Sequence, residues 1–276
     1  MYSRVYIEIG NICNMNCSFC HKTKRQKHQM SFDEFKKVVA SLSGVTEYLY
    51  FHVMGEPLLH PELCSFIEYA SGQGFKCAVT TNGTLLSCVG DALLSSSVYK
   101  VNISLHSFED GSREEYLEYI SSCLDFADRA SKKGILTVLR LWNRGCDDGR
   151  NINTLEMAQN KFPDGEWRHS ERGARIRHKL HVEYGERFAW PDMNARDMGE
   201  EVFCYGLGDH FGVLCHGTVV PCCLDSEGDI PLGNIFSSPI EEILSSERAT
   251  KMREGFACRH ATEQLCRKCG YARRFK

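Results

Sequence analysis

Segments with strand-like and helix-like patterns alternate through the first half of the chain. The strand-like runs lie at residues 5–9, 47–53, 75–80, 100–106 and 135–142. Five units in which a helix follows a strand predict a parallel sheet with crossover helices, either as an open sheet or as a full or partial barrel. Because either form places its chemistry at the carboxyl ends of the strands, we expect functional residues directly after these runs.

The helix-like segments separate these runs and indicate where the pattern ends. Ser31 and Glu34 form a capping box in front of the first one. Further helices are expected at residues 61–72, 85–94, 113–133 and 154–161, and a sixth strand is expected at 179–184. The later part of the chain turns to short Gly-rich strands and carries seven of the fifteen cysteines. We therefore predict a barrel domain at residues 1–198 and a small cysteine-rich domain of a β-hairpin and helices at residues 199–276.

Cysteine is the abnormal component of the composition, with fifteen in 276 residues. The N-terminal residues lack the charged start and apolar stretch of a signal peptide, and no run is long enough to span a membrane, so we expect a cytoplasmic protein without a membrane partner. Cysteines in that compartment bind metals or clusters more often than they form disulfides. A net charge of −3 gives no argument from bulk charge for a nucleic acid partner.

Three cysteines follow the first predicted strand with the spacing C-x3-C-x2-C: Cys13, Cys17 and Cys20. Three thiolates leave one iron of a cubane cluster open for a cofactor or substrate, whereas structural zinc takes four protein ligands. A zinc site completed by His21 or His28 is the alternative. The spacing therefore favours an iron–sulfur cluster with an open iron.

These residues resemble the radical S-adenosylmethionine (radical SAM) superfamily, whose hallmark is this triplet with an aromatic residue before the third cysteine. Phe19 fills that position, and Met54-Gly55-Glu56-Pro57 after the second strand looks like the family's Gly-Gly-Glu-Pro motif. The resemblance implies a partial (β/α)6 TIM-type barrel with a [4Fe–4S] cluster held by the three cysteines and SAM. It also implies that Phe19, Gly55, Glu56 and Pro57 belong to the cofactor site.

Weaker matches extend the implied SAM site to later strand ends. Asn82 follows the third strand, and Ser104 and His106 are expected on one face of the fourth. The family places such residues near the carboxylate and ribose of SAM. Arg140, near the end of the fifth strand, could pair the SAM carboxylate, although a lone strand arginine is as often structural.

The cysteines of the last segment suggest a second cluster. Cys204, Gly217 and Cys222 read as C-x12-G-x4-C, and Cys266 and Cys269 form a closing C-x2-C. This pattern resembles the SPASM and twitch extensions of radical SAM enzymes, in the shortened form that implies one auxiliary [4Fe–4S] cluster. A zinc ribbon is the alternative.

Three further cysteines of this segment have no assigned cluster role, and the sequence does not decide between Cys222 and Cys223 as a ligand. Cys223 is a candidate catalytic residue, as a hydrogen-atom donor beside the cluster, or else a small buried residue. Cys215 and Cys258 are left over. Basic runs at residues 21–28 and 168–179 read as solvated loops or as a positive rim for an anionic substrate; without interleaved aromatic residues they do not favour nucleic acid, which stays open.

The resemblance implies an enzyme that reductively cleaves SAM to a 5′-deoxyadenosyl radical and abstracts a hydrogen atom from its substrate. Oxidation or dehydrogenation of a small molecule, helped by the auxiliary cluster, is the leading interpretation. Met1 lies just before the first strand, which leaves no room for a peptide-binding domain and favours a small molecule. The alternatives are a peptide-modifying enzyme and a non-enzymatic zinc- or cluster-binding protein. An external electron donor such as flavodoxin or ferredoxin is implied as a partner.

Overall fold

The predicted alternation of strands and helices is present in the computed structural model, which describes residues 1–275. The parallel strands are β1 (Arg4–Ile7), β2 (Tyr48–Phe51), β3 (Lys76–Thr81), β4 (Lys100–Ser104), β5 (Leu136–Arg144) and β8 (Leu180–Glu186). The helices between them are α1 (Phe32–Ser41), α2 (Leu63–Gly72), α3 (Leu86–Ser95), α4 (Arg113–Lys132) and α5 (Arg150–Lys161). The expected capping box of Ser31 and Glu34 starts α1.

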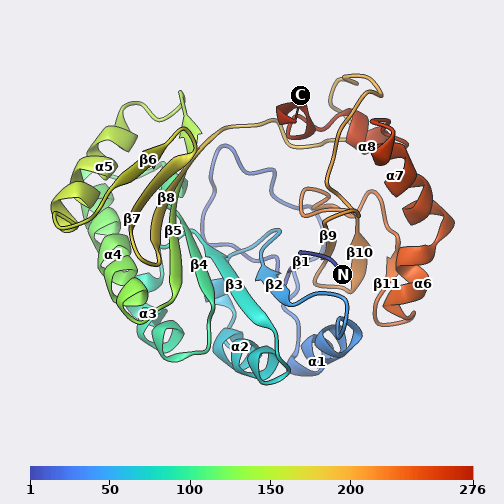
Figure 1. The fold of residues 1–276 in the computed structure, drawn as a ribbon, viewed down its shortest axis with the longest axis horizontal. Helices are drawn as coiled ribbons and strands as arrows, with labels where there is room; N and C mark the ends of the chain where they lie inside the picture. Colours follow the sequence, from blue (N-terminus) through green and yellow to red (C-terminus); the bar gives the residue numbers. More distant parts are fainter. Residues whose placement is uncertain (276) are drawn as a thin grey trace.

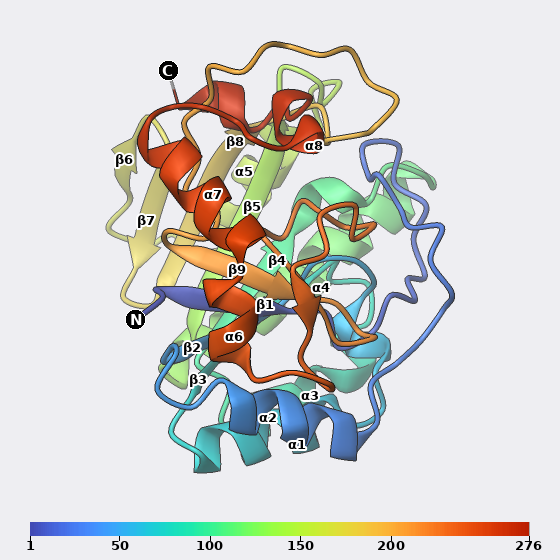
Figure 2. The same cartoon turned by 90° about the vertical axis from the view of Figure 1, so that its right-hand side faces the viewer.

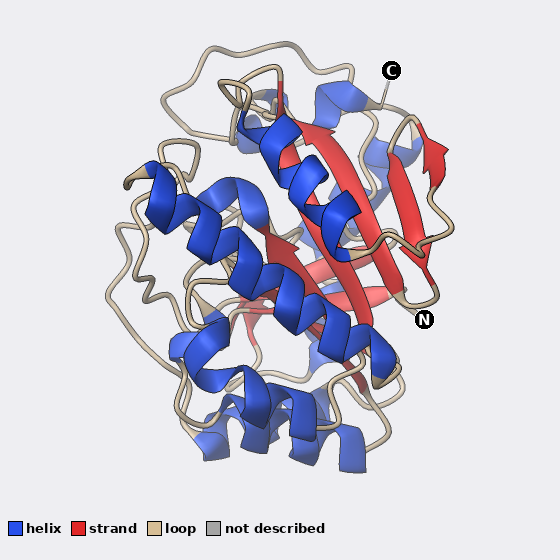
Figure 3. Cartoon of the chain, turned by 90° about the vertical axis from the view of Figure 1, so that its left-hand side faces the viewer, coloured by secondary structure: helices blue, strands red, loops and turns tan. Residues whose placement is uncertain are grey.

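The strands form one curved sheet that does not close, so the predicted partial barrel is confirmed. Its strand order is β11-β10-β9-β1-β2-β3-β4-β5-β8-β7-β6. Helices α1 to α5 cover the convex face, and the long loop after β1 crosses the concave side (Figure 1). Seen from the β8 side, α4 runs diagonally in front of the strands (Figure 3).

Alternating side chains give the sheet an apolar outer face and a polar inner face. Val5, Leu49 and Val101 point outward and are fully buried under the helices. Their neighbours along the strands, such as Tyr50 and Lys100, line a cavity on the inner face. Because side chains alternate with a period of two in a strand, one apolar core and one polar chamber share the same strands.

The C-terminal segment extends the same sheet. Strand β9 (His210–Val213) pairs with β1 in parallel, and β10 (Thr218–Val220) and β11 (Gly233–Asn234) follow in antiparallel order. Helices α6 (Ile240–Ser245) and α7 (Glu247–Ala257) lie beside β9, and α8 (Gln264–Arg267) lies above them in the view of Figure 2. The boundary at residue 198/199 stays a prediction, and the last residue of the predicted second domain, Lys276, lies outside the described residues.

Two local features differ from the expectation. The fourth strand ends at Ser104, and Leu105–Ser107 form a 3-10 turn, η2, so His106 does not share a strand face with Ser104 as predicted. An antiparallel hairpin, β6 (Arg168–Ser170) and β7 (Gly173–Arg177), was not expected, because every residue of β6 is exposed and leaves no apolar pattern. Within residues 1–275 no helix combines the length and apolar character needed to cross a bilayer.

Candidate active site

A cavity of about 820 Å³ occupies the concave side of the sheet. Its wall includes both predicted cysteine sets and most of the predicted cofactor residues; the ones that line it are Cys13, Cys17, Cys20, Phe19, Gly55, Glu56, Asn82, Ser104, His106, Arg140, Cys204, Cys222, Cys223, Cys266 and Cys269. Pro57 does not line it, because it begins the buried 3-10 turn η1 (Pro57–Leu59) behind Glu56. Segments distant in sequence thus meet at one chamber.

The loop that carries the cysteine triplet is tied to the turn after β2. The Glu56 amide donates to the Ile12 carbonyl at 2.8 Å. Gly55 has φ +80°, and a Cβ there would lie 2.3 Å from the Gly10 carbonyl oxygen. Glycine is therefore needed at residue 55 both for its conformation and for the close approach of the two loops.

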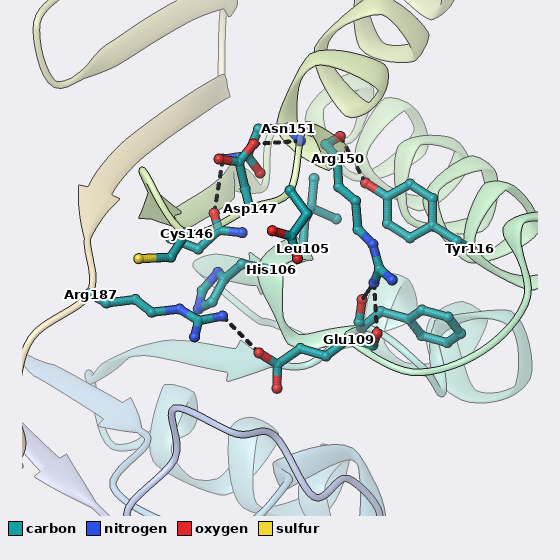
Figure 4. Close-up of a pocket in the computed structure, with 12 residues that line it drawn as sticks. Leu105, His106, Glu109, Tyr116, Cys146, Asp147, Arg150, Asn151 and Arg187 are labelled. Carbon is teal, nitrogen blue, oxygen red and sulfur yellow. Dashed lines mark hydrogen bonds and ion pairs between the residues drawn. The ribbon is translucent and has the colours of Figure 1, made fainter.

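A second tie to the cysteine loop comes from Glu109 and Arg187. The Ser18 amide and hydroxyl both donate to the Glu109 carboxylate, the hydroxyl at 2.7 Å. Arg187 donates to the same carboxylate at 2.7 Å and lies over the Phe19 ring at 5.4 Å (Figure 4). Sequence reasoning missed Glu109 and Arg187, because both lie in loops where no motif or periodicity marks them.

The triplet thiols lie close enough to affect one another. Burial and the charges of Cys20 and Cys13 raise the pKa of Cys17 to about 12. Burial, with smaller contributions that include the charges of Glu56 and Cys20, raises the pKa of Cys13. Crowded, half-buried thiols without a cation are costly to ionise, whereas a bound iron centre would compensate the thiolate charge. The donor set therefore fits an iron–sulfur cluster.

No three His, Cys, Asp or Glu side chains within residues 1–275 converge closely enough to hold a single metal ion. The ligands of a mononuclear zinc must meet at one point, whereas each thiolate of a cubane cluster binds its own iron corner. The described thiols therefore lack the single meeting point that one zinc ion needs, a requirement that a cubane cluster does not share.

Glu56 joins three segments beside the triplet. One carboxylate oxygen accepts hydrogen bonds from the Leu58 amide at 3.0 Å and the Thr81 hydroxyl at 2.7 Å. The other accepts from the Asn82 amide at 2.7 Å. Burial raises the pKa of Glu56, and these hydrogen bonds oppose that shift.

Asn82 orients the loop after β3 toward the cysteines. Its side-chain amide donates to the side-chain oxygen Oδ1 of Asn14 at 2.9 Å and lies 3.9 Å from the Cys13 sulfur. The Tyr119 hydroxyl on α4 donates to the Asn82 backbone carbonyl at 2.7 Å. Asn82 is thus held between a helix and the triplet.

His106, in the turn η2 after β4, and Arg140, on β5, come together. The His106 ring nitrogen Nδ1 lies 3.1 Å from the Arg140 carbonyl oxygen, and the ring packs on Phe19 with centroids 5.0 Å apart. Burial lowers the pKa of His106 to about 4, so the ring is neutral. The Arg140 side chain bonds Glu183 at 3.2 Å and lies 4.6 Å from the Trp142 ring. Arg140 therefore has a protein partner, as the structural alternative expects, while its side chain still lines the cavity.

The C-terminal cysteines form a second group on the cavity wall. The pKa of Cys222 is raised by burial and by the charges of nearby cysteines, which are Cys223, Cys204, Cys269 and Cys266. A Cβ on Gly206 would lie 3.5 Å from the Cys204 sulfur and 3.7 Å from Cys222 Cβ. These thiols therefore also offer a crowded donor set suited to a cluster.

The remaining cysteines of this segment have other surroundings, although Cys223 also lines the cavity. Cys223 packs with Tyr6 against Val53 and Leu214, and burial raises its pKa to about 12. The buried Cys215 lies with Glu8 and Arg25 rather than with the other thiols. Cys258 is exposed at the end of α7.

Family models match both parts of the chain. The model described as the radical SAM superfamily matches residues 7–166, and the SPASM model, described as an iron-sulfur cluster-binding domain, matches residues 204–270. The first match covers more than half of the chain and contains the triplet and the Gly-Glu-Pro turn. The second contains all four predicted auxiliary ligands.

Curated relatives match over part of the chain. GTP 3′,8-cyclase of Chlorobaculum tepidum is 33% identical over 131 residues, which are 44% of this chain and 39% of that protein. An S-adenosylmethionine-dependent nucleotide dehydratase of Selenomonas ruminantium is 31% identical over 88 residues, 31% of this chain and 32% of that protein. The aligned regions thus cover less than half of the length of these relatives.

Solved structures match over nearly the whole chain. BtrN in complex with AdoMet and 2-DOIA has a TM-score of 0.63 at 18% identity, covering 98% of this chain and 93% of that chain. His-tagged anSMEcpe with bound AdoMet has a TM-score of 0.63 at 14% identity, covering 97% and 88%. Streptococcus suis SuiB bound to its precursor peptide has a TM-score of 0.55 at 14% identity, covering 98% and 70%. At these identities the likeness concerns the fold.

Proposed function

The chain belongs to the radical SAM superfamily and carries a SPASM iron–sulfur domain, and from this premise we propose that it is an oxidoreductase acting on a small organic substrate. Membership implies a [4Fe–4S] cluster, SAM and an auxiliary iron–sulfur cluster. When bound, these groups supply a reductive cleavage of SAM, removal of a hydrogen atom from the substrate, and a site for the second electron of an oxidation.

Different residues along the cavity would bind the two clusters and position SAM. Cys13, Cys17 and Cys20 would hold the first cluster, and Cys204, Cys222, Cys266 and Cys269 would hold the auxiliary one. Glu56, Asn82, Ser104, His106 and Arg140 would position SAM, with Gly55 and Pro57 shaping the turn and Phe19 packing beside it. The division into a barrel of residues 1–198 and a cluster domain of residues 199–276 belongs to this proposal.

Cys223 is the candidate hydrogen-atom donor inside the chamber. Its thiol is protonated at neutral pH, because burial raises its pKa to about 12. It lines the cavity beside Tyr6 and is adjacent in sequence to Cys222. A protonated thiol that borders the chamber could give a hydrogen atom to a substrate radical, which would leave a thiyl radical for the external electron donor to reduce. That outcome is redox-neutral for the substrate, so it is the alternative to the oxidation in which the auxiliary cluster takes the electron.

The size of the chamber supports a small substrate. About 820 Å³ is within the range of roughly 300–1,000 Å³ typical of small-molecule sites, and SAM must share it. A peptide-modifying role is the second candidate, because SuiB and anSMEcpe were solved with peptides and share the fold. An external electron donor such as flavodoxin or ferredoxin would reduce the cluster.

One observation carries the proposal: both cysteine sets, with Gly55 and Glu56 of the Gly-Glu-Pro turn, line the same cavity. The test is formation of 5′-deoxyadenosine from SAM and dithionite by anaerobically reconstituted protein. We expect product from the wild type and from Cys88→Ala, whose cysteine is exposed on α3, and none from Cys17→Ala. Equal product from Cys17→Ala, or none from the wild type, would refute the proposal.

A further inference from the structure

The cavity has a second end, opposite the cysteine loop. Arg4 is the first residue of β1 and Lys100 is the first residue of β4, and both line the cavity. Strand register places Tyr50 beside Ala78 and Ala78 beside Lys100, so Tyr50 and Lys100 lie at one level. Four residues separate this level from Ser104 at the end of β4, a distance of about 13 Å along the strand. We call this end the chamber floor, formed by Arg4, Tyr50 and Lys100.

The floor holds more positive charge than its carboxylates neutralise. Arg4 pairs with Asp209 at 2.9 Å, but its Nε is buried and has no hydrogen-bond partner among residues 1–275. Lys100 Nζ lies 5.8 Å from the centre of the Tyr50 ring, and the Arg4 guanidinium lies 5.7 Å from it. Glu183 is the one carboxylate of the described chain that acts on Lys100, and it is already bonded to Arg140. At the floor, Lys100 therefore faces the chamber without an ion-pair partner among residues 1–275.

This arrangement is costly for the protein alone. Burial, together with the charges of Arg140 and Arg4, lowers the pKa of Lys100 to about 8, and the charge of Glu183 opposes this shift. A partly buried cation next to other cations destabilises a fold unless an anion compensates it. A ligand with negative charge would supply that compensation.

We propose that the chamber floor binds an oxyanion group of the substrate, a carboxylate or a phosphate, through Lys100 Nζ, with the Arg4 guanidinium adding positive charge to the same floor. This inference rests on the proposed function, because that function is what places the reacting carbon of the substrate near the cysteine loop. The substrate is then a small molecule with an acidic group at the floor and its reacting carbon toward the cysteine loop. The floor selects for that charge and fixes the orientation of the molecule in the chamber.

The test measures anion binding by the reconstituted protein with SAM, using inorganic phosphate and acetate at constant ionic strength and isothermal titration calorimetry. We expect saturable binding, and binding at least about tenfold weaker in Lys100→Met, as for loss of one charge-assisted contact. Lys76→Met is the matched control, because Lys76 begins the neighbouring strand β3 and does not line the cavity. Tighter binding of phosphate would indicate a phosphorylated substrate, and similar binding of acetate a carboxylate.

A second readout separates loss of binding from loss of folding. Lys100→Met should melt a few degrees higher than the wild type without anion, because it removes an uncompensated cation, and Lys76→Met should not. No saturable binding of either anion, or equal binding by wild type and Lys100→Met, would overturn the inference. Formation of 5′-deoxyadenosine by the wild type is measured in parallel. If the nucleoside forms but no anion binds, only the floor proposal fails; if no nucleoside forms, the proposed function fails as well.

Discussion

Cys222 and Cys223 are adjacent in sequence but have different surroundings, which bears on which of them would be a cluster ligand. Cys222 has Cys204, Cys266 and Cys269 near it in addition to Cys223, whereas Cys223 packs with Tyr6 against the Val53 and Leu214 cluster. Sequence spacing alone could not choose between them, because the alternatives differ by one residue. The choice depends on which way each side chain points from the turn after β10, and that is set by packing.

Residue 55 must be glycine because of its backbone conformation and its close contact with the neighbouring loop. Gly55→Ala should destabilise the fold by about 2–4 kcal/mol, because the new Cβ meets the Gly10 carbonyl in addition to the positive φ. Gly44→Ala is the matched control: its φ is +77° and nothing lies within 4 Å of the new Cβ, so it should cost only about 1–2 kcal/mol. Urea unfolding measures both, and equal losses would contradict the close-approach argument.

Lys100 predicts a dependence of stability on pH. Its pKa is lowered from 10.5 to about 8, so between these values the unfolded chain holds a proton that the folded chain has released, and stability rises with pH. Lys100→Met should therefore be more stable than the wild type by about 1–3 kcal/mol near neutral pH, with the difference shrinking above about pH 8. The groups that face Lys100 are unchanged in the variant: Arg4, Tyr6, Tyr50, Arg140, His181 and Glu183. Chemical denaturation of wild type and Lys100→Met near neutral pH and above about pH 8 tests this. A stability difference that does not change with pH would argue against a buried, uncompensated lysine.

At the scale of elements, the cysteine loop depends on contacts from other segments. Glu109→Gln should weaken the tie to Ser18 and Arg187, so that the reconstituted protein releases iron to a chelator several-fold faster. Glu166→Gln is the control, because Glu166 forms an exposed pair with Arg168. Unchanged iron release from Glu109→Gln would show that the tie does not support the cluster.

The elements also show where sequence reasoning succeeds. The alternating strands and helices were predicted because each buries an apolar face with its own period, as Val5 and Phe35 do. The β6–β7 hairpin was missed because β6 is exposed throughout and β7 is short and carries two arginines, so neither shows a clear apolar alternation. The turn at His106 was missed because it satisfies a tertiary contact with Arg140, which leaves no local signal.

At the scale of the whole molecule, the half-barrel and the C-terminal segment share a buried ion pair. Arg25 donates to Glu8 at 2.6 Å and to the Ser226 carbonyl at 2.8 Å, while Glu8 accepts from the Cys215 amide at 3.0 Å. Arg25 belongs to the first basic run, which reads as a solvated loop in sequence, but its side chain is only 14% exposed. Part of that run is therefore structural.

Removing Arg25 should loosen the joint between the two parts. Arg25→Met leaves Glu8 buried without its partner and should cost about 3–5 kcal/mol. Arg168→Met removes an exposed pair and should cost at most about 1 kcal/mol. Equilibrium denaturation compares them, and a similar loss in both would mean that the buried pair contributes little.

The candidate site could be predicted in part for a physical reason. Motif residues such as Cys13, Cys17 and Glu56 follow strand ends, so their meeting at one edge of a parallel sheet is expected. Glu109, Arg187 and the charged floor at Lys100 reach the site only through three-dimensional packing, and no spacing in the sequence indicates them.

The central claim is that one chamber is bordered by two separate cluster sites, and iron content per chain tests it most directly. Anaerobically reconstituted wild type and Cys223→Ala should each hold about eight irons, and Cys17→Ala and Cys222→Ala about four each. About four irons in the wild type, zinc in place of iron, or loss of iron in Cys223→Ala but not in Cys222→Ala would contradict the account.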